Sequence, residues 1–239
     1  MLSEIDFRNV LFLDIETVPQ SPSFKDLPEK TRVLWDKKSS YFRNEEQEAD
    51  TVYEKAGIYA EFGKIICISV GVITREKKPY GIRIRSYSGS DEKKILEDFV
   101  GMIDKYSADK EVYLCAHNGK EFDFPYIARR MLINGLKLPG ILDSAGKKPW
   151  DIKHLDTLEL WKFGDYKHYT SLDLLTNIFN IPSPKNDMDG SMVADVFWNQ
   201  GDLKRIAEYC QNDVLAIAQL MLRYKGMDLI PSENIEYVE

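Results

Sequence analysis

The chain has 239 residues, and its formal net charge of −7 argues against the large basic surface typical of many nucleic-acid-binding proteins. Clustered acids at a metal site would also lower the net charge, so nucleic acid is not excluded as a ligand. Hydrophobic residues make up 44% of the chain, which is enough for a sizeable core, and no apolar run reaches the length of a membrane span. We expect one domain over residues 1–239, without a membrane segment.

The three cysteines, Cys67, Cys115 and Cys210, lie far apart and form no C-x-x-C pair. Each lies in an apolar stretch, which favours buried free thiols over disulfides or zinc ligands. The odd count and the lack of a signal peptide predict a reducing, cytoplasmic location.

The first predicted strand covers residues 9–17 and reads Val-Leu-Phe-Leu-Asp-Ile-Glu-Thr from position 10. Its apolar half is typical of a strand buried on both faces, where an ionised carboxylate is costly unless it is paired or bound to a metal. Because side chains alternate along a strand, Asp14 and Glu16 point to the same side, roughly 7 Å apart. The pair therefore predicts a cation site.

Residues 19–61 are polar, with scattered aromatic residues, and we interpret them as an insertion that contains some helix. The insertion could cover the two acids. Its acidic run, residues 45–50, is typical of a solvated helix face.

Hydrophobic periodicity predicts the elements that follow. Strands are expected at residues 64–74, 81–88, 111–116 and, at an edge, 153–157. Helices are expected at residues 91–106, 124–134, 171–179, 191–199 and 202–224. Strands that precede interspersed helices predict an α/β domain around a mixed sheet.

In the last predicted helix, Tyr209 and Asp213 fall together on one flank of the apolar stripe. An acid beside the buried face can reach a sheet, with the tyrosine hydroxyl next to it. An ordinary salt bridge at the boundary of the stripe is the alternative.

Asp123 lies between a predicted strand and the predicted helix that contains Pro125, which suits a first helical turn. Helix capping alone would explain an aspartate at this position. A metal ligand is the other interpretation.

Other kinds of site have little support. The histidines lack metal-ligand spacing, and the sequence contains neither a G-x-S-x-G elbow nor a phosphate-binding G-x-x-x-x-G-K-[ST] loop. Turn chemistry is the default explanation for four further acids, Asp151, Asp156, Asp187 and Asp189.

Three motifs in this order resemble the DEDD superfamily of 3′–5′ exonucleases. They are Asp14-Ile15-Glu16, Asn118 with Phe122-Asp123, and Tyr209 followed four residues later by Asp213. The tyrosine, with Glu208 in place of histidine, resembles the tyrosine subtype. The phrases FLDIETVP, EYCQNDV and GKIICISVGV are similar to predicted exonucleases related to the proofreading domain of family-B DNA polymerases.

The resemblance implies a ribonuclease H-like α/β fold, with a mixed central sheet flanked by helices on both faces. It also implies two Mg²⁺ or Mn²⁺ ions held by Asp14, Glu16, Asp123 and Asp213, with Tyr209 orienting the attacking water. Residues implied to contact the strand are Thr17, Asn118 and Phe122, while Ser171 and Lys185 lie in segments that border its path, where capping and surface roles are equally compatible.

The resemblance thus implies a metal-dependent exonuclease that releases nucleoside 5′-monophosphates from single-stranded 3′ ends, with DNA favoured over RNA. A separate polymerase or repair protein would be the partner in any proofreading role. The alternatives are an RNase D-like or short-oligonucleotide exoribonuclease, and a non-catalytic nucleic-acid-binding module.

Overall fold

The computed structural model describes residues 2–74, 79–165, 169–182 and 188–238, and their centre is a six-stranded sheet. The strands are β1 Val10–Pro19, β2 Gly63–Thr74, β3 Gly81–Ser88, β4 Tyr113–Ala116, β5 Leu155–Asp156 and β6 Ile235–Val238. Their order across the sheet is β5-β4-β1-β2-β3-β6.

The sheet is mixed, as predicted. β1, β2 and β3 form an antiparallel meander, whereas β4 is parallel to β1, and β5 is parallel to β4. This arrangement of the first five strands is ribonuclease H-like and confirms the expected fold class. β6, which pairs in parallel with β3 at the other edge, was not expected from the sequence.

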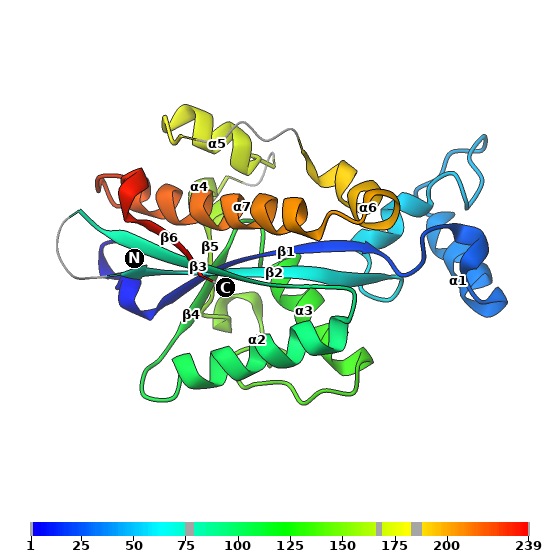
Figure 1. The fold of residues 1–239 in the computed structure, drawn as a ribbon, viewed down its shortest axis with the longest axis horizontal. Helices are drawn as coiled ribbons and strands as arrows, with labels where there is room; N and C mark the ends of the chain where they lie inside the picture. Colours follow the sequence, from blue (N-terminus) through cyan, green and yellow to red (C-terminus); the bar gives the residue numbers. More distant parts are fainter. Residues whose placement is uncertain (1, 75–78, 166–168, 183–187, 239) are drawn as a thin grey trace.

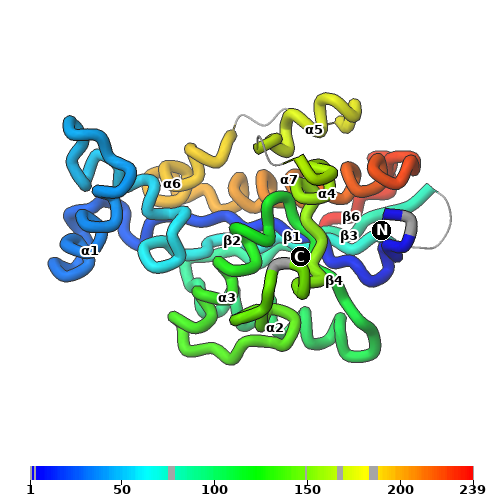
Figure 2. The backbone as a smooth tube through the Cα atoms, turned by 180° about the vertical axis from the view of Figure 1, so that it is seen from behind, coloured from blue at the N-terminus to red at the C-terminus, as the bar shows by residue number. Residues whose placement is uncertain are grey.

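Helices cover both faces of the sheet (Figures 1 and 2). The helices are α1 Glu29–Ser39, α2 Glu92–Tyr106, α3 Asp123–Ile133, α4 Thr157–Lys162, α5 Leu172–Ile178, α6 Val193–Asp195 and α7 Leu203–Tyr224. α2 and α3 lie on one face, α4, α5, α6 and α7 lie on the other, and α1 projects beyond the carboxyl end of β1. No helix among the described residues is both long and apolar enough to span a membrane.

The alternation of β1 places its residues in two cores. Leu11, Leu13 and Ile15 pack with the helices α2 and α3, whereas Val10 and Phe12 pack with α7. Asp14 and Glu16 continue the alternating series of Val10 and Phe12, so their side chains point toward α7.

α7 lies close to the sheet where it crosses β2. A Cβ atom built on Gly71 would lie 2.7 Å from a methyl carbon of Val214, so a larger residue at position 71 would push the helix away. The glycine thereby determines how closely the residue before Val214, Asp213, approaches the acids of β1.

The segment between β1 and β2 has an aromatic core of its own. Trp35 of α1 is fully buried, its ring contacts Tyr53 and Phe62, and its indole N–H donates to the carbonyl of Ala49 at 2.8 Å. The acidic run is largely exposed, as expected, but residues 45–50 form turns instead of a helix.

Two regions differ from the sequence-based expectations. The predicted edge strand ends at Asp156 and continues directly into α4, because the Asp156 carboxylate caps this helix. The helix predicted at 191–199 consists of a 3₁₀ turn Gly190–Met192, the short α6 and a π-helix Val196–Gln200. The three cysteines are free and buried, as predicted.

Candidate active site

The first two acids lie where β1 reaches an irregularity in the sheet. Asp14 is partly buried and Glu16 is 8% exposed. β1 pairs regularly with β2 until Glu16, which lies opposite Cys67, and the register then shifts so that Thr17 lies opposite Ile65. Such a bulge bends and twists a strand and reorients its side chains.

α7 supplies the second pair of groups. Asp213 and Tyr209 lie one helical turn apart, and the tyrosine side chain lies near the Asp213 carboxylate, whose pKa it lowers against the larger effect of burial. Cys210, which follows Tyr209 in α7, donates its S–H to the backbone carbonyl of Asp14 at 3.4 Å. This contact places the polar flank of α7 directly over the acids of β1.

Asp123 reaches the same place from the opposite layer. The pairing of β4 with β1 ends at Phe12, so the edge of β1 beyond this residue is open to the start of α3. There the Asp123 carboxylate lies near the backbone N–H of Ile15, which lowers its pKa against the larger effect of burial. The capping interpretation is wrong, since the N-cap position is Phe122 and Asp123 is the first residue of the helix.

All four carboxyls have raised pKa values in the metal-free protein. Burial is the main cause of the strongly raised pKa of Asp14 and of Glu16, and the charge of Asp213 is the next. Burial also raises the pKa of Asp123 to about 7 and that of Asp213 to about 6. A bound cation would relieve this cost.

The donor atoms fit a divalent cation. One ligand atom from each of Asp14, Glu16 and Cys210 lies within 4.8 Å of the others. In addition, Asp14 Oδ2 is buried without a hydrogen-bond partner among the described residues, which is rare for a carboxylate oxygen. Carboxylate oxygens are preferred ligands of hard divalent cations, so this side of β1 could hold a metal.

The residues that the resemblance implies contact the substrate lie in different parts of the fold. Thr17 follows the acids and interacts with the Tyr126 hydroxyl. Asn118 adopts a φ of 62° in the turn after β4, and Phe122 is half-buried, with its ring 5.4 Å from that of Tyr126. Ser171 is exposed and caps α5, accepting from the N–H of Leu174 at 3.2 Å. Lys185 lies outside the described residues.

Sequence reasoning missed the role of Asp156, which is 4% exposed. Its carboxylate accepts the backbone N–H groups of Asn118 and Lys120, both at 3.0 Å, and those of Leu158 and Glu159 at 2.9 and 3.2 Å. Asp156 therefore fixes the turn that leads to Asp123. The signal that could have revealed this role is the parallel pairing of β4 and β5, because the carboxyl ends of neighbouring parallel strands lie at the same edge of the sheet.

A second missed group connects α5 with this turn. One ring nitrogen of His117 lies 2.9 Å from the hydroxyl of Thr157, and the other lies 2.9 Å from the carbonyl of Thr170. Burial raises the pKa of Tyr169, and the charges of Asp123, Asp156 and Asp213 add to this effect. The sequence did not predict the contacts of His117, because a single histidine does not indicate which groups its ring will bond.

The relatives of this chain include DNA polymerases. A DNA polymerase from Pyrococcus glycovorans is 24% identical over 235 residues, which cover 87% of this chain and 28% of the polymerase. A solved family B DNA polymerase from Pyrobaculum calidifontis has 16% sequence identity and a TM-score of 0.48, over 90% of this chain and 24% of that one. The chain thus spans about a quarter of the length of these polymerases.

The family model that matches is described as a predicted 3′–5′ exonuclease related to the exonuclease domain of PolB, and it covers residues 58–233. The match includes Asp123, Tyr209 and Asp213, and it begins after the acids of β1. It extends over well over half of the chain. The chain therefore belongs to the family of predicted 3′–5′ exonucleases related to the exonuclease domain of PolB.

Proposed function

We propose that this chain is a metal-dependent 3′–5′ exonuclease of the tyrosine DEDD subtype, acting on single-stranded ends and favouring DNA over RNA. The observation that carries the proposal is the convergence of four carboxyls, two from β1 and one each from α3 and α7, each of which has a raised pKa. A structural role does not account for four mutually repelling acids beside one buried strand.

The four acids would hold two ions, Mg²⁺ or Mn²⁺. Asp14 would contact both, Glu16 and Asp213 would complete the first position, and Asp123 would serve the second. When bound, the ions neutralise the phosphate charge and make the attacking water more acidic. Tyr209, which lies beside Asp213, would orient that water for in-line attack on the last phosphodiester, releasing a nucleoside 5′-monophosphate.

The terminal nucleotide would lie between β1 and the turn after β4. Thr17 and the adjacent backbone would hold it, Asn118 would contact the last sugars, and the half-buried ring of Phe122 would stack on a base. Ser171 and Lys185 would border the path of the strand.

The organisation and setting of the protein are also part of the proposal. Residues 1–239 would form a single exonuclease domain, in which residues 19–61 are an insertion. The setting would be cytoplasmic, and a polymerase or repair protein would be the partner in any proofreading role.

Degradation of end-labelled single strands tests this function. With 3′-labelled and 5′-labelled DNA and RNA of the same sequence, we expect Mn²⁺-dependent release of mononucleotides from the 3′ end, faster for DNA. Asp14→Asn should abolish the activity, whereas the control Asp104→Asn, on the exposed side of α2, should retain it. Equal activity in Asp14→Asn would refute the mechanism.

The same assay separates the alternatives. A ladder from RNA alone would instead identify a 3′–5′ exoribonuclease. Strand binding without cleavage at any metal concentration would indicate a non-catalytic binding module.

A further inference from the structure

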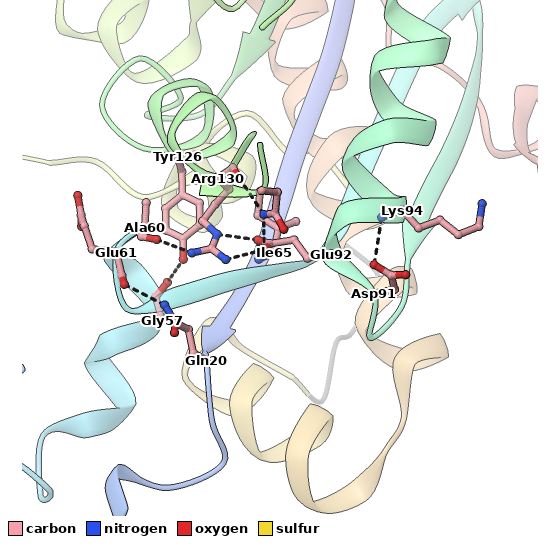
Figure 3. A network of polar contacts seen from close by, with 11 residues as sticks. Gln20, Gly57, Ala60, Glu61, Ile65, Asp91, Glu92, Lys94, Tyr126 and Arg130 are labelled. Carbon is pink, nitrogen blue, oxygen red and sulfur yellow. Dashed lines mark hydrogen bonds and ion pairs between the residues drawn. The ribbon is translucent and has the colours of Figure 1, made fainter. Parts of the chain in front are cut away.

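A buried polar network connects α2, the acid-bearing helix α3, Ile65 of β2 and the last residues before β2 (Figure 3). Its centre is the ion pair of Glu92, in the first turn of α2, with Arg130 of α3. Both residues are buried, at 7% and 5% exposure. A buried ion pair is weak evidence for stability, because removing two charges from water offsets their attraction. The residues that this pair joins indicate a different role.

The first connection leads to the bulge beside the acids. The pairing of β1 with β2 shifts after Glu16, and Ile65, which lies opposite Thr17, donates its backbone N–H to Glu92 Oε1 at 2.7 Å. Glu92 therefore satisfies a buried backbone donor of β2 beside the bulge. The conformation of the sheet next to Glu16 and Thr17 depends on a side chain from α2.

The second connection leads to the helix that begins at Asp123. Arg130 donates from Nε to Glu92 Oε1 at 2.8 Å and from Nη2 to Oε2 at 2.5 Å. This planar, bidentate geometry fixes both the distance and the angle between the partners. Because Asp123 and Arg130 lie seven residues apart on one face of α3, fixing the arginine fixes the direction in which the aspartate projects.

The third connection leads to the chain segment that enters β2. Arg130 Nη1 donates to the carbonyl of Ala60 at 2.8 Å, and the Tyr126 hydroxyl donates to the carbonyl of Gly57 at 2.7 Å. A Cβ atom on Gly63 would lie 2.3 Å from that hydroxyl, so glycine is required there. The same hydroxyl interacts with Thr17, one residue beyond Glu16.

We propose that Glu92, Tyr126 and Arg130 are positioning residues, which set the place of Asp123 relative to Asp14 and Glu16. The network holds α3 against the bulge and against the carbonyls of residues 57 and 60, without touching substrate or ions. This proposal rests on the proposed function, because it concerns the geometry of the same carboxylates. A purely structural role predicts lower stability and nothing more.

Two variants release the network without burying an unpaired charge. Glu92→Gln combined with Arg130→Met keeps an acceptor for the Ile65 N–H but removes the bidentate clamp and the bond to Ala60. Tyr126→Phe keeps the ring and removes the hydroxyl alone. The matched control is Gln219→Met, since Gln219 is 4% exposed and bonds both the N–H and the carbonyl of Ile230, at 2.8 and 2.9 Å, at the far end of α7.

The readouts are the melting temperature without metal, Mn²⁺ binding by calorimetry, and kcat and KM on a single-stranded oligonucleotide. We expect the double variant to bind Mn²⁺ at least about fivefold more weakly and to lose at least about tenfold in kcat, with KM within about threefold of wild type. Tyr126→Phe should show a smaller change in the same direction. Gln219→Met should lower the melting temperature and leave Mn²⁺ binding and kcat unchanged.

The outcomes separate the two proposals. If wild type binds Mn²⁺ and the double variant matches it in Mn²⁺ affinity and kcat, the positioning role is refuted and the proposed function stands. The positioning role is also refuted if Gln219→Met reduces Mn²⁺ affinity as much as the double variant does. If wild type itself neither binds Mn²⁺ nor degrades strands, the proposed function fails, and the positioning role fails with it.

Discussion

Asp14 shows most directly that the acids of β1 serve a ligand. Its Oδ2 atom is buried without a hydrogen-bond partner among the described residues, and its pKa is raised by burial first and then by three neighbouring acids. Each of these features opposes folding when no cation is present. At the scale of the residue, the site is therefore a locally unfavourable arrangement, which the rest of the fold stabilises.

The pH dependence of metal-free stability follows from these pKa values. A carboxyl whose pKa is raised on folding contributes stability below its unfolded pKa and loses it as pH rises through the folded value. With Asp123 at about 7 and Asp213 at about 6, the free energy of unfolding should fall by at least ~2 kcal/mol between about pH 5 and about pH 8. Urea titrations with a chelator would measure it, and saturating Mn²⁺ should reverse the trend. A pH-independent free energy would argue against buried, repelling carboxyls.

Substitution of Tyr209 should lower the catalytic rate more than it lowers the affinity for the metal. Its side chain lies beside Asp213 but is not one of the four carboxylates, so Tyr209→Phe should keep Mn²⁺ affinity within about twofold. Losing the group that orients the attacking water should lower kcat by about 10²-fold. Single-turnover kinetics and calorimetry on the same preparation would test both. A parallel loss of metal affinity would instead assign Tyr209 a structural role.

At the scale of the element, strand alternation and the point where strand pairing ends decide where the acids of β1 and α3 lie. β1 supplies two because alternation directs them toward α7, and α3 supplies one because β4 stops pairing with β1 at Phe12. The turn between β4 and α3 is itself held by Asp156 across the neighbouring strand. The position of Asp123 is therefore decided by residues more than thirty positions away along the chain.

Asp156→Ala should disturb this turn and the start of α4 together. Four backbone N–H groups would lose their acceptor, and buried unpaired donors cost about 1–3 kcal/mol each, partly recovered by water. We expect a loss of about 2–4 kcal/mol in the free energy of unfolding, and weaker Mn²⁺ binding than Asp156→Asn, which retains one acceptor oxygen. Equal Mn²⁺ affinity in both variants and wild type would show that the turn does not control Asp123.

At the scale of the whole molecule, residues 20–62 have their own aromatic core, and the carbonyls of Gly57 and Ala60 join this segment to α3. Trp35 makes ring contacts with four aromatic residues of this segment, Phe42, Tyr53, Tyr59 and Phe62. These contacts support the proposal that the segment is an insertion that folds around the tryptophan and not around the main cores.

Trp35→Ala should therefore disrupt the insertion first. Removing a fully buried tryptophan costs about 3–5 kcal/mol, and here the loss falls on a small core. We expect limited proteolysis to cut within residues 24–56 while the remainder of the chain resists. Simultaneous digestion of the sheet would mean that the segment and the sheet fold as one unit.

The sequence alone determined the central strand, the antiparallel hairpin beside it, the long last helix and the order of the acidic motifs. These depend on local periodicity and on residue types that are costly without a ligand, and both can be recognised in a linear sequence. Because these predictions rest on local patterns, they failed at two elements. Residues 191–199 contain a π-helix that their apolar spacing does not reveal. β6 is a short strand that forms only by pairing with β3.

Only the tertiary structure decided which acids meet and what holds them. Asp156, an acid that turn chemistry explained from the sequence, fixes the turn before Asp123, while Glu92 and Arg130 connect three elements that are distant along the chain. Such contacts form between residues tens of positions apart, and they depend on strand order, on a bulge and on where pairing ends. No local pattern encodes these features, because they arise from packing whole elements against one another.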